Sequence, residues 1–359
     1  MRRIALILTA LAFSAAGAAA AAEPAKKFRA WPPQEDTPAG AEMRASLADA
    51  GRIAFATNRD KNWEIYSVNA DGTDIKNLTN HPGRDAYPRW SADGKKIVFW
   101  SDRDGPPMPG PGGVPPLRRG KGMLYIMDAD GSNQKRVARG THGAFSPDGK
   151  VLAFRRGSRI WLRGVEAGRE VAVSPRSWRN ATMPVFSPDA RHLLFIINTR
   201  HWDVVAVPVD PAAGYVTHPN KHWIVSTRKG CNPEFLPPTA DRIIHVVDLA
   251  RDTESGFVTV PFVSHKKQKA IEIKLGWDAP SWNYFPDPSP DGKHLAYSHG
   301  PGYKHPAGGE RGWEMTKNME LVVRRFSDGE TIWLTKTGKV NRDPDWFDSK
   351  LAPRETEAE

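Results

Sequence analysis

One six-residue phrase recurs along the chain and constrains its fold more than any other feature. An aromatic or apolar residue is followed by Ser-Pro-Asp-Gly-Lys or a near copy, and then by a short apolar strand. Pro sets the backbone of the first turn position, and Asp-Gly completes a turn that reverses one strand into the next. Each copy therefore predicts a β-hairpin. Clear copies begin at Trp90, Phe145, Phe186 and Pro288, and a decayed copy begins at Phe235.

The spacing of these copies predicts a closed ring of repeats. Successive copies begin 55, 41, 49 and 53 residues apart, near the ~40–50 residues of a four-stranded propeller blade. Residues 343–347 resemble residues 86–90 but lack a following strand, which residues 51–57 can supply. Pairing of these two segments closes the ring and removes exposed sheet edges. The predicted fold class is all-β: a six-bladed β-propeller of four-stranded blades, closed by pairing of its N- and C-terminal segments.

A second phrase supplies the outer half of a blade. Residues 64–73 and 124–132 alternate apolar and polar side chains and contain an Asp-Gly turn, which predicts another hairpin. With both phrases present, the chain resembles the TolB-like family of periplasmic β-propellers, whose WD-like repeats carry W/F-S-P-D-G-K and I-Y-x-M-D-A-D-G phrases. The resemblance covers residues 51–348. It implies a propeller that binds envelope proteins or peptides.

The segments outside the repeats predict an exported protein. Residues 1–22 combine Arg2 and Arg3 with an apolar stretch and an Ala-rich end, as a cleaved signal peptide does. Residues 23–50 are predicted to form a flexible N-terminal tether, residues 51–348 the propeller and residues 349–359 a disordered charged tail. No other apolar run approaches the ~20 residues that span a bilayer. We therefore expect a periplasmic or secreted monomer without a transmembrane segment.

Charge and cysteine content narrow the classes of partner. The chain has 51 Lys and Arg against 41 Asp and Glu, a formal net charge of +10. An excess of basic residues permits anionic partners, and export argues against nucleic acid. An envelope protein or peptide, or an acidic glycan, is the expected partner. The single Cys231 excludes an internal disulfide and Cys-rich metal motifs.

Candidate binding residues lie in the loops that lead into the inner strands, because these loops converge around the channel of a propeller. Arginine side chains turned to the channel would hold a carboxylate or sulfate through paired hydrogen bonds. The alternative is that these residues only hold the blades together, which is the favoured interpretation of the pairs Arg59-Asp60 and Arg103-Asp104. The candidates are Arg84, Asp85, Arg179, Asn180, Trp282, Asn283, Arg342 and Asp343.

Two loop features remain open between binding and structure. The insertions at 105–122 and 300–318 interrupt the repeat between the second and third strands of their blades, where binding loops or low-complexity decoration occur. Trp63, Trp202 and Trp282 also lie in loops. There an exposed indole would stack on a sugar ring, whereas a buried one would pack the blades.

Two functions follow from these features. The predicted function is that of a non-catalytic scaffold that binds a protein or ligand in the cell envelope, without cofactor or metal. The alternative is a polysaccharide lyase acting on uronate-containing glycans, in which His142, His201 and His299 would bind a divalent metal in the channel or act as the base. A Gly-x-Ser-x-Gly nucleophile motif is absent, which argues against a peptidase.

Overall fold

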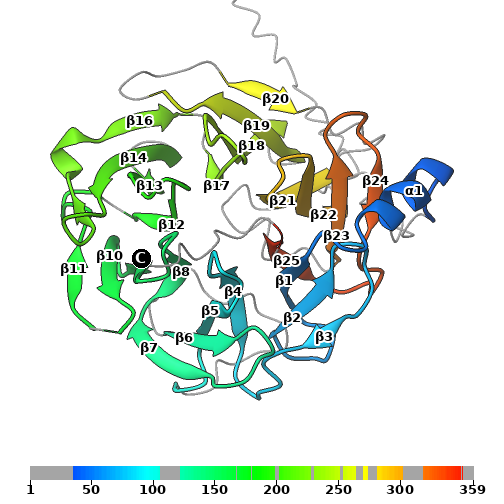
Figure 1. Cartoon of the computed structure of the whole chain (residues 1–359), viewed down its shortest axis with the longest axis horizontal. Helices are drawn as coiled ribbons and strands as arrows, with labels where there is room; N and C mark the ends of the chain where they lie inside the picture. Colours follow the sequence, from blue (N-terminus) through cyan, green and yellow to red (C-terminus); the bar gives the residue numbers. More distant parts are fainter. Residues whose placement is uncertain are drawn as a thin grey trace, which may run out of the picture. The chain divides into compact units, whose positions relative to one another are not determined.

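Six antiparallel sheets follow one another around a central axis in the computed structural model (Figure 1). The structure describes residues 35–105, 122–166, 168–178, 180–198, 202–227, 230–250, 254–263, 270–273, 281–301, 318–348 and 350. Within these residues, five sheets have four strands and one has five. The predicted six-bladed β-propeller is confirmed.

Each blade runs from an inner strand beside the axis to an outer strand at the rim. The first blade consists of β25 (Asn341–Phe347), β1 (Arg52–Thr57), β2 (Glu64–Asn69) and β3 (Lys76–Asn77). The second consists of β4 (Asp85–Trp90), β5 (Lys96–Ser101), β6 (Met123–Asp128) and β7 (Lys135–Arg139). The third consists of β8 (Thr141–Phe145), β9 (Val151–Arg156), β10 (Arg159–Gly164) and β11 (Glu170–Ala172).

The other three blades follow the same order. The fourth consists of β12 (Thr182–Phe186), β13 (His192–Asn198), β14 (Trp202–Asp210), β15 (Val216–Thr217) and β16 (Trp223–Ser226), with the 3-10 helix η1 (Pro219–Lys221) between the last two. The fifth consists of β17 (Cys231–Phe235), β18 (Arg242–Ala250), β19 (Glu254–Pro261) and β20 (Ile271–Ile273). The sixth consists of β21 (Ser281–Pro288), β22 (His294–Pro301), β23 (Glu320–Arg325) and β24 (Thr331–Trp333).

The first blade closes the ring with strands from distant parts of the chain. Strand β25 pairs antiparallel with β1, so that Trp346 lies opposite Ile53 and Phe347 lies opposite Arg52. The indole N–H of Trp346 also donates to the carbonyl of Ala50 at 2.7 Å. The predicted closure of the ring is thus confirmed.

The recurring Ser-Pro-Asp-Gly-Lys phrase forms a self-contained turn. Ser146 Oγ donates to Asp148 at 2.6 Å, while the amides of Lys150 and Val151 donate to Asp148 and Ser146. The phrase therefore satisfies the polar groups of its own turn before any other blade is present. The same bonds occur at Ser91 and Asp93, at Ser187 and Asp189, and at Ser289 and Asp291.

The second strand of each blade anchors the core with one side chain at its fourth position. In five blades this residue is aromatic and 0% exposed. Four of the five belong to the apolar core clusters, and the fifth, Tyr297, packs edge-on against Phe257. In the fifth blade the position holds His245, which is also 0% exposed and makes a 2.9 Å hydrogen bond between Nε2 and Ser226 Oγ. The five aromatic residues are Phe55, Phe99, Phe154, Phe195 and Tyr297.

Part of the predicted flexible tether is folded against the ring. Helix α1 (Pro38–Ser46) begins after Thr37, whose Oγ1 accepts from the amide of Gly40 at 2.9 Å. Met43 and Leu47 are buried in the core between the first and sixth blades. The sequence alone did not indicate this helix, because its apolar residues find their partners only on the assembled blades. None of the helices in the described part of the chain is long and apolar enough to cross a membrane.

The ring has two different faces. We call the loop face the one where the second strand of a blade connects to the third and where one blade connects to the next. The opposite side, which carries the Asp-Gly turns, is the turn face. Connections 102–122 and 302–319 belong to the loop face, between second and third strands as predicted. Residues 106–121 and 302–317 of these insertions lie outside the described residues.

Candidate functional site in the central channel

Every inner strand contains a residue in the left-handed backbone region, close to the loop face. The six residues have φ between 51° and 57°, and each lies at a register shift in the pairing of its inner strand. Such a bulge bends the strand and redirects its side chains. Four of the six are not glycine, asparagine or aspartate, so this conformation is strained. The ring consists of Tyr87, His142, Met183, Asn232, Phe285 and Asp343.

These six residues line a small cavity on the propeller axis. Its volume is about 40 Å³, and the proline or glycine that follows five of the ring residues completes its wall. Space of this size holds about three water molecules. It is far below the ~300 Å³ or more of a pocket for a drug-sized ligand. The cavity therefore fits the tip of a side chain but not a sugar ring.

Beneath this ring, one arginine connects four blades. Arg89 donates to Asp345 at 2.9 Å, also donates to Glu234, and lies 3.7 Å from Asp287. Asp287 also accepts from the amide of Trp346 at 2.5 Å. Burial and the neighbouring carboxylates raise the pKa of Asp287 well above its usual range, and burial raises the pKa of Glu234 and Asp345 too.

Arg342 and Asp343 form a second ion pair at the channel. Arg342 donates through Nε at 2.8 Å and through a terminal nitrogen at 3.2 Å to the two oxygens of Asp343. The guanidinium also lies 4.5 Å from the ring centre of Phe285 and 5.3 Å from that of Tyr87. Both residues were predicted to face the channel. Arg342 thus makes with its neighbour Asp343 the paired hydrogen bonds that it was expected to make with a ligand.

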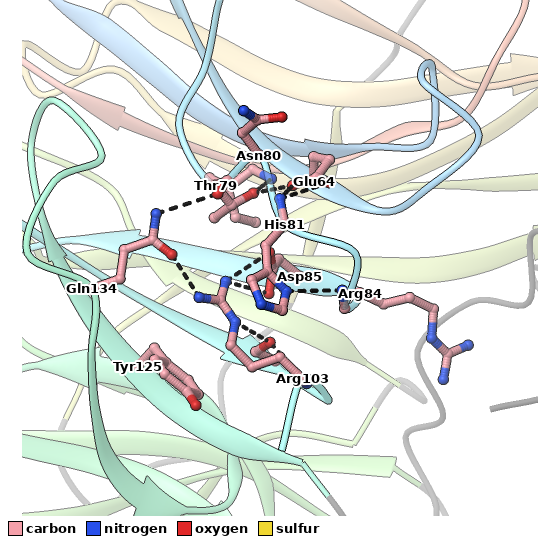
Figure 2. A network of polar contacts seen from close by, with 12 residues as sticks. Glu64, Thr79, Asn80, His81, Arg84, Asp85, Arg103, Tyr125 and Gln134 are labelled. Atoms are coloured by element: carbon pink, nitrogen blue, oxygen red, sulfur yellow. Dashed lines mark hydrogen bonds and ion pairs between the residues drawn. The ribbon is translucent and has the colours of Figure 1, made fainter. Parts of the chain in front are cut away.

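Arg84 and Asp85 are each bonded to a residue of the connection that follows β5. Arg84 Nε donates to Asp102 at 2.8 Å, while Arg103 donates to both oxygens of Asp85 at 2.9 and 3.0 Å. Figure 2 shows Arg103 between Asp85 and Gln134, to which it donates at 2.7 Å. These bonds join the start of the second blade, at Arg84 and Asp85, to the residues that follow β5, and none of these residues lines the channel cavity. Their evident role is to hold the loop face in shape.

The titration of Asp85 gives a test of this network. Burial raises the pKa of Asp85 to about 7, although Arg103 opposes the shift. The usual value is ~3.9, so the folded chain holds this proton more tightly than the unfolded chain, and Asp85 should lower stability as pH rises from about 4 to about 7. We expect Asp85→Asn to gain stability relative to the parent over that range, measured as urea midpoints at several pH values. A difference in urea midpoint between the two proteins that stays constant across this pH range would contradict the shifted pKa of Asp85.

The histidines of the lyase alternative occupy different surroundings. His142 lines the channel cavity and stacks against Tyr87, with ring centres 4.2 Å apart. His299 is 0% exposed, bonds Asn283 at 2.6 Å through Nδ1, and is not part of the cavity wall. His201 lies outside the described residues. Within the residues that the structure describes, no group of three or more His, Cys, Asp or Glu side chains is arranged to hold a metal ion.

The remaining candidates lie in the walls of the blades. Trp282 is 6% exposed and stacks on Tyr284, with ring centres 5.6 Å apart. Asn283 is 1% exposed and bonded to Ser255. Asn180 is half-buried and is not part of the cavity wall, and Arg179 lies outside the described residues.

The tryptophans proposed for sugar stacking differ in exposure. Trp63 is 1% exposed and Trp282 is 6% exposed, so neither indole offers a face to a sugar; both pack the blades instead. Trp202 is half-buried.

The Arg89 cluster was not among the predicted sites, although the repeat contains a signal for it. Its members hold the same position, immediately before the aromatic residue or proline that opens the turn phrase. At that position the third and fourth blades have Ala144 and Val185, whereas the other four have charged residues. Aligning the repeats on the inner strand, and not on the turn, would have revealed the cluster. Its members are Arg89, Glu234, Asp287 and Asp345.

Comparison with known proteins places the fold. No family model matches the chain. Among solved structures it is similar to TolB from Acinetobacter baumannii, with 14% identity and a TM-score of 0.58 over 83% of this chain and 67% of that one. It is similar to putative TolB from Agrobacterium tumefaciens, with 16% identity and a TM-score of 0.52 over 79% and 89%. A chain of the nidogen/laminin complex matches with 10% identity and a TM-score of 0.55 over 83% and 98%. At these identities the likeness concerns the fold, and the chain therefore has the six-bladed propeller fold of the TolB-like structures, as its repeats predict.

Proposed function

We propose that this chain is an exported, non-catalytic propeller that binds an envelope protein or peptide at its loop face. The observation that carries the proposal is the channel. All six blades contribute a residue in the left-handed region, four of them strained, to one cavity near the loop face, and this cavity accepts a side-chain tip but not a sugar ring. Strained backbone that recurs at one site is characteristic of binding sites on rigid scaffolds.

Two further observations support an envelope partner. The features of residues 1–22 are those of a secretory signal peptide. Among the similar structures, the nidogen/laminin complex is an assembly of proteins, and TolB-like propellers share the ring on which such binding is built. Because a fold hosts many functions, the proposal depends on the channel and not on the likeness.

Site-specific photo-crosslinking tests the proposal directly. A photoreactive amino acid at Lys61 or Ser158, both exposed on the loop face, is expected to capture a protein partner in cells that export the chain. The same amino acid at Asp130 or Lys150, exposed on the turn face, is the control and should capture none. Equal capture from both faces, or none from the loop face, would contradict the proposal.

A second measurement separates the proposal from the lyase alternative. We expect the purified mature chain to leave uronate-containing polysaccharides unchanged, measured as absorbance at ~235 nm, where the unsaturated product of β-elimination absorbs. The metal content of the same sample is measured by mass spectrometry. Rising absorbance that requires a bound divalent metal would replace the binding function with the lyase.

A further inference from the structure

The positive charge of the chain is concentrated around its third blade. Between Lys135 and Arg176 the sequence has ten Lys or Arg and three Asp or Glu, which accounts for most of the formal net charge of +10. The rest of the chain is close to neutral. A basic region of this kind attracts anionic partners and increases their rate of association.

Four of these arginines lie at the loop-face ends of their strands and form what we call the third-blade arginine patch: Arg139, Arg155, Arg156 and Arg159. Arg156 and Arg159 lie on one face of the sheet, and Arg155 projects from the other. Arg156 lies opposite Arg159 in the β9–β10 pairing and donates to the carbonyl of Arg139 at 2.9 Å. Arg155 lies opposite Thr141, the first residue of inner strand β8. The patch therefore extends from the rim to the edge of the channel.

The turn beside the patch is short and exposed. Strands β9 and β10 are joined by only two residues, Gly157 and Ser158, and both are exposed. In the second blade, by comparison, residues 102–122 separate the corresponding strands.

Two of the four arginines carry charge without a carboxylate partner in the described part of the chain. Arg156 is held by both oxygens of Glu170, at 2.5 and 2.8 Å. The ion pairs among the described residues include neither Arg155 nor Arg159; each uses Nε to reach a carbonyl, of Gly157 at 2.8 Å and of Ser174 at 2.7 Å. Since a guanidinium has five N–H donors, the terminal nitrogens remain for an anion. Burial lowers the pKa of Arg155, which nevertheless stays cationic at neutral pH.

Aromatic packing holds the patch in position before any ligand arrives. Arg156 and Arg159 lie 5.0 and 5.6 Å from the ring centre of Trp161. Such stacking restricts the guanidinium groups and reduces the entropy lost on binding. It also covers the indole, so Trp161 cannot serve as a platform for a sugar.

The patch lies beside a histidine of the cavity wall. His142 follows Thr141, is 8% exposed, and has no hydrogen-bond partner at Nε2 within the described residues. Arg155 is close enough to help depress its pKa, after burial. When Thr141 donates to Nδ1, at 3.2 Å, the proton of the neutral ring lies on Nε2.

We propose that the third-blade arginine patch binds an acidic peptide segment of the protein partner. The inference rests on the proposed function and names the chemistry of its partner. A peptide fits better than an acidic glycan, because the cavity is too small for a sugar ring and Trp161 is covered. Glu234 and Asp343, the acids in the cavity wall, are already bound by Arg89 and Arg342.

Fluorescent oligoglutamate is the probe that tests the patch, with oligoglutamine and oligogalacturonate as comparisons. The parent chain should bind oligoglutamate, and the affinity should fall as ionic strength rises. Arg155→Glu with Arg159→Glu should weaken binding at least about tenfold. Lys150→Glu with Arg169→Glu changes the net charge equally in the same blade, but at the turn face, and should weaken it far less.

Several outcomes would overturn the inference. Equal loss in the two charge-reversed proteins would mean that only net charge matters, and preference for oligogalacturonate would make the ligand a glycan. Arg155→Met with Arg159→Met keeps the side-chain stems, so binding that survives in this folded variant would also reject the patch. If Lys61 captures a protein and no patch variant changes oligoglutamate binding, the proposed function stands and the inference fails.

Discussion

Arg89→Met is expected to be among the most destabilising single substitutions in this propeller. The change leaves Glu234, Asp287 and Asp345 close together in the channel without their shared cation. Removing one partner of a buried ion pair costs about 3–5 kcal/mol, because the remaining charges stay desolvated. Urea unfolding at neutral pH measures the loss.

Rescue and control variants identify the cause. Adding Glu234→Gln and Asp287→Asn to Arg89→Met should restore much of the stability, because the amides remove the uncompensated charges. Arg325→Met breaks an exposed pair with Asp328 and should change the midpoint little. If Arg89→Met unfolds at the parent midpoint, Arg89 does not compensate these carboxylates.

Trp346→Ala is expected to weaken the closure of the ring. Trp346 is 6% exposed, packs between the first and sixth blades, and bonds Ala50 through its indole. Loss of a buried tryptophan typically costs about 3–5 kcal/mol. The substitution weakens the pairing of β25 with β1, and no short turn joins these two strands. The unfolding transition measured in urea should therefore also become less cooperative.

Trp90→Ala is the matched control for this prediction. Trp90 has the corresponding position in β4, but it is only half-buried, and a short turn joins β4 to its neighbour β5. A smaller loss with unchanged cooperativity is expected. Equal losses at the two positions would show that closure is no weaker than an ordinary blade.

The fold was predictable because its determinants are local. The turn phrase carries its own hydrogen bonds, as Ser146 and Asp148 show, so its sequence indicates a hairpin wherever it occurs. Closure of the ring by residues 343–347 and 51–57 was predictable because each of these segments supplies only part of a blade. Helix α1 was missed because Met43 and Leu47 are buried only by contacts that the finished blades supply.

The site was less predictable because its contacts are not local. Sequence proximity suggested the pairs Arg84-Asp85 and Arg103-Asp104, whereas the bonds run from Arg84 to Asp102 and from Arg103 to Asp85. Antiparallel strands bring the two loops together, and nothing in either loop alone specifies which charge meets which. Arg89 has the same explanation, since its partners come from three other blades.

The first blade can be completed only after its inner strand β25 has been synthesised. As the chain is synthesised, β1, β2 and β3 appear first, and β1 keeps an unpaired edge until β25 becomes available. An exposed strand edge recruits any other extended chain, including a second copy of the same protein. The nascent ring is therefore most vulnerable to aggregation in the interval in which the second to sixth blades have formed and the first blade still lacks its inner strand β25.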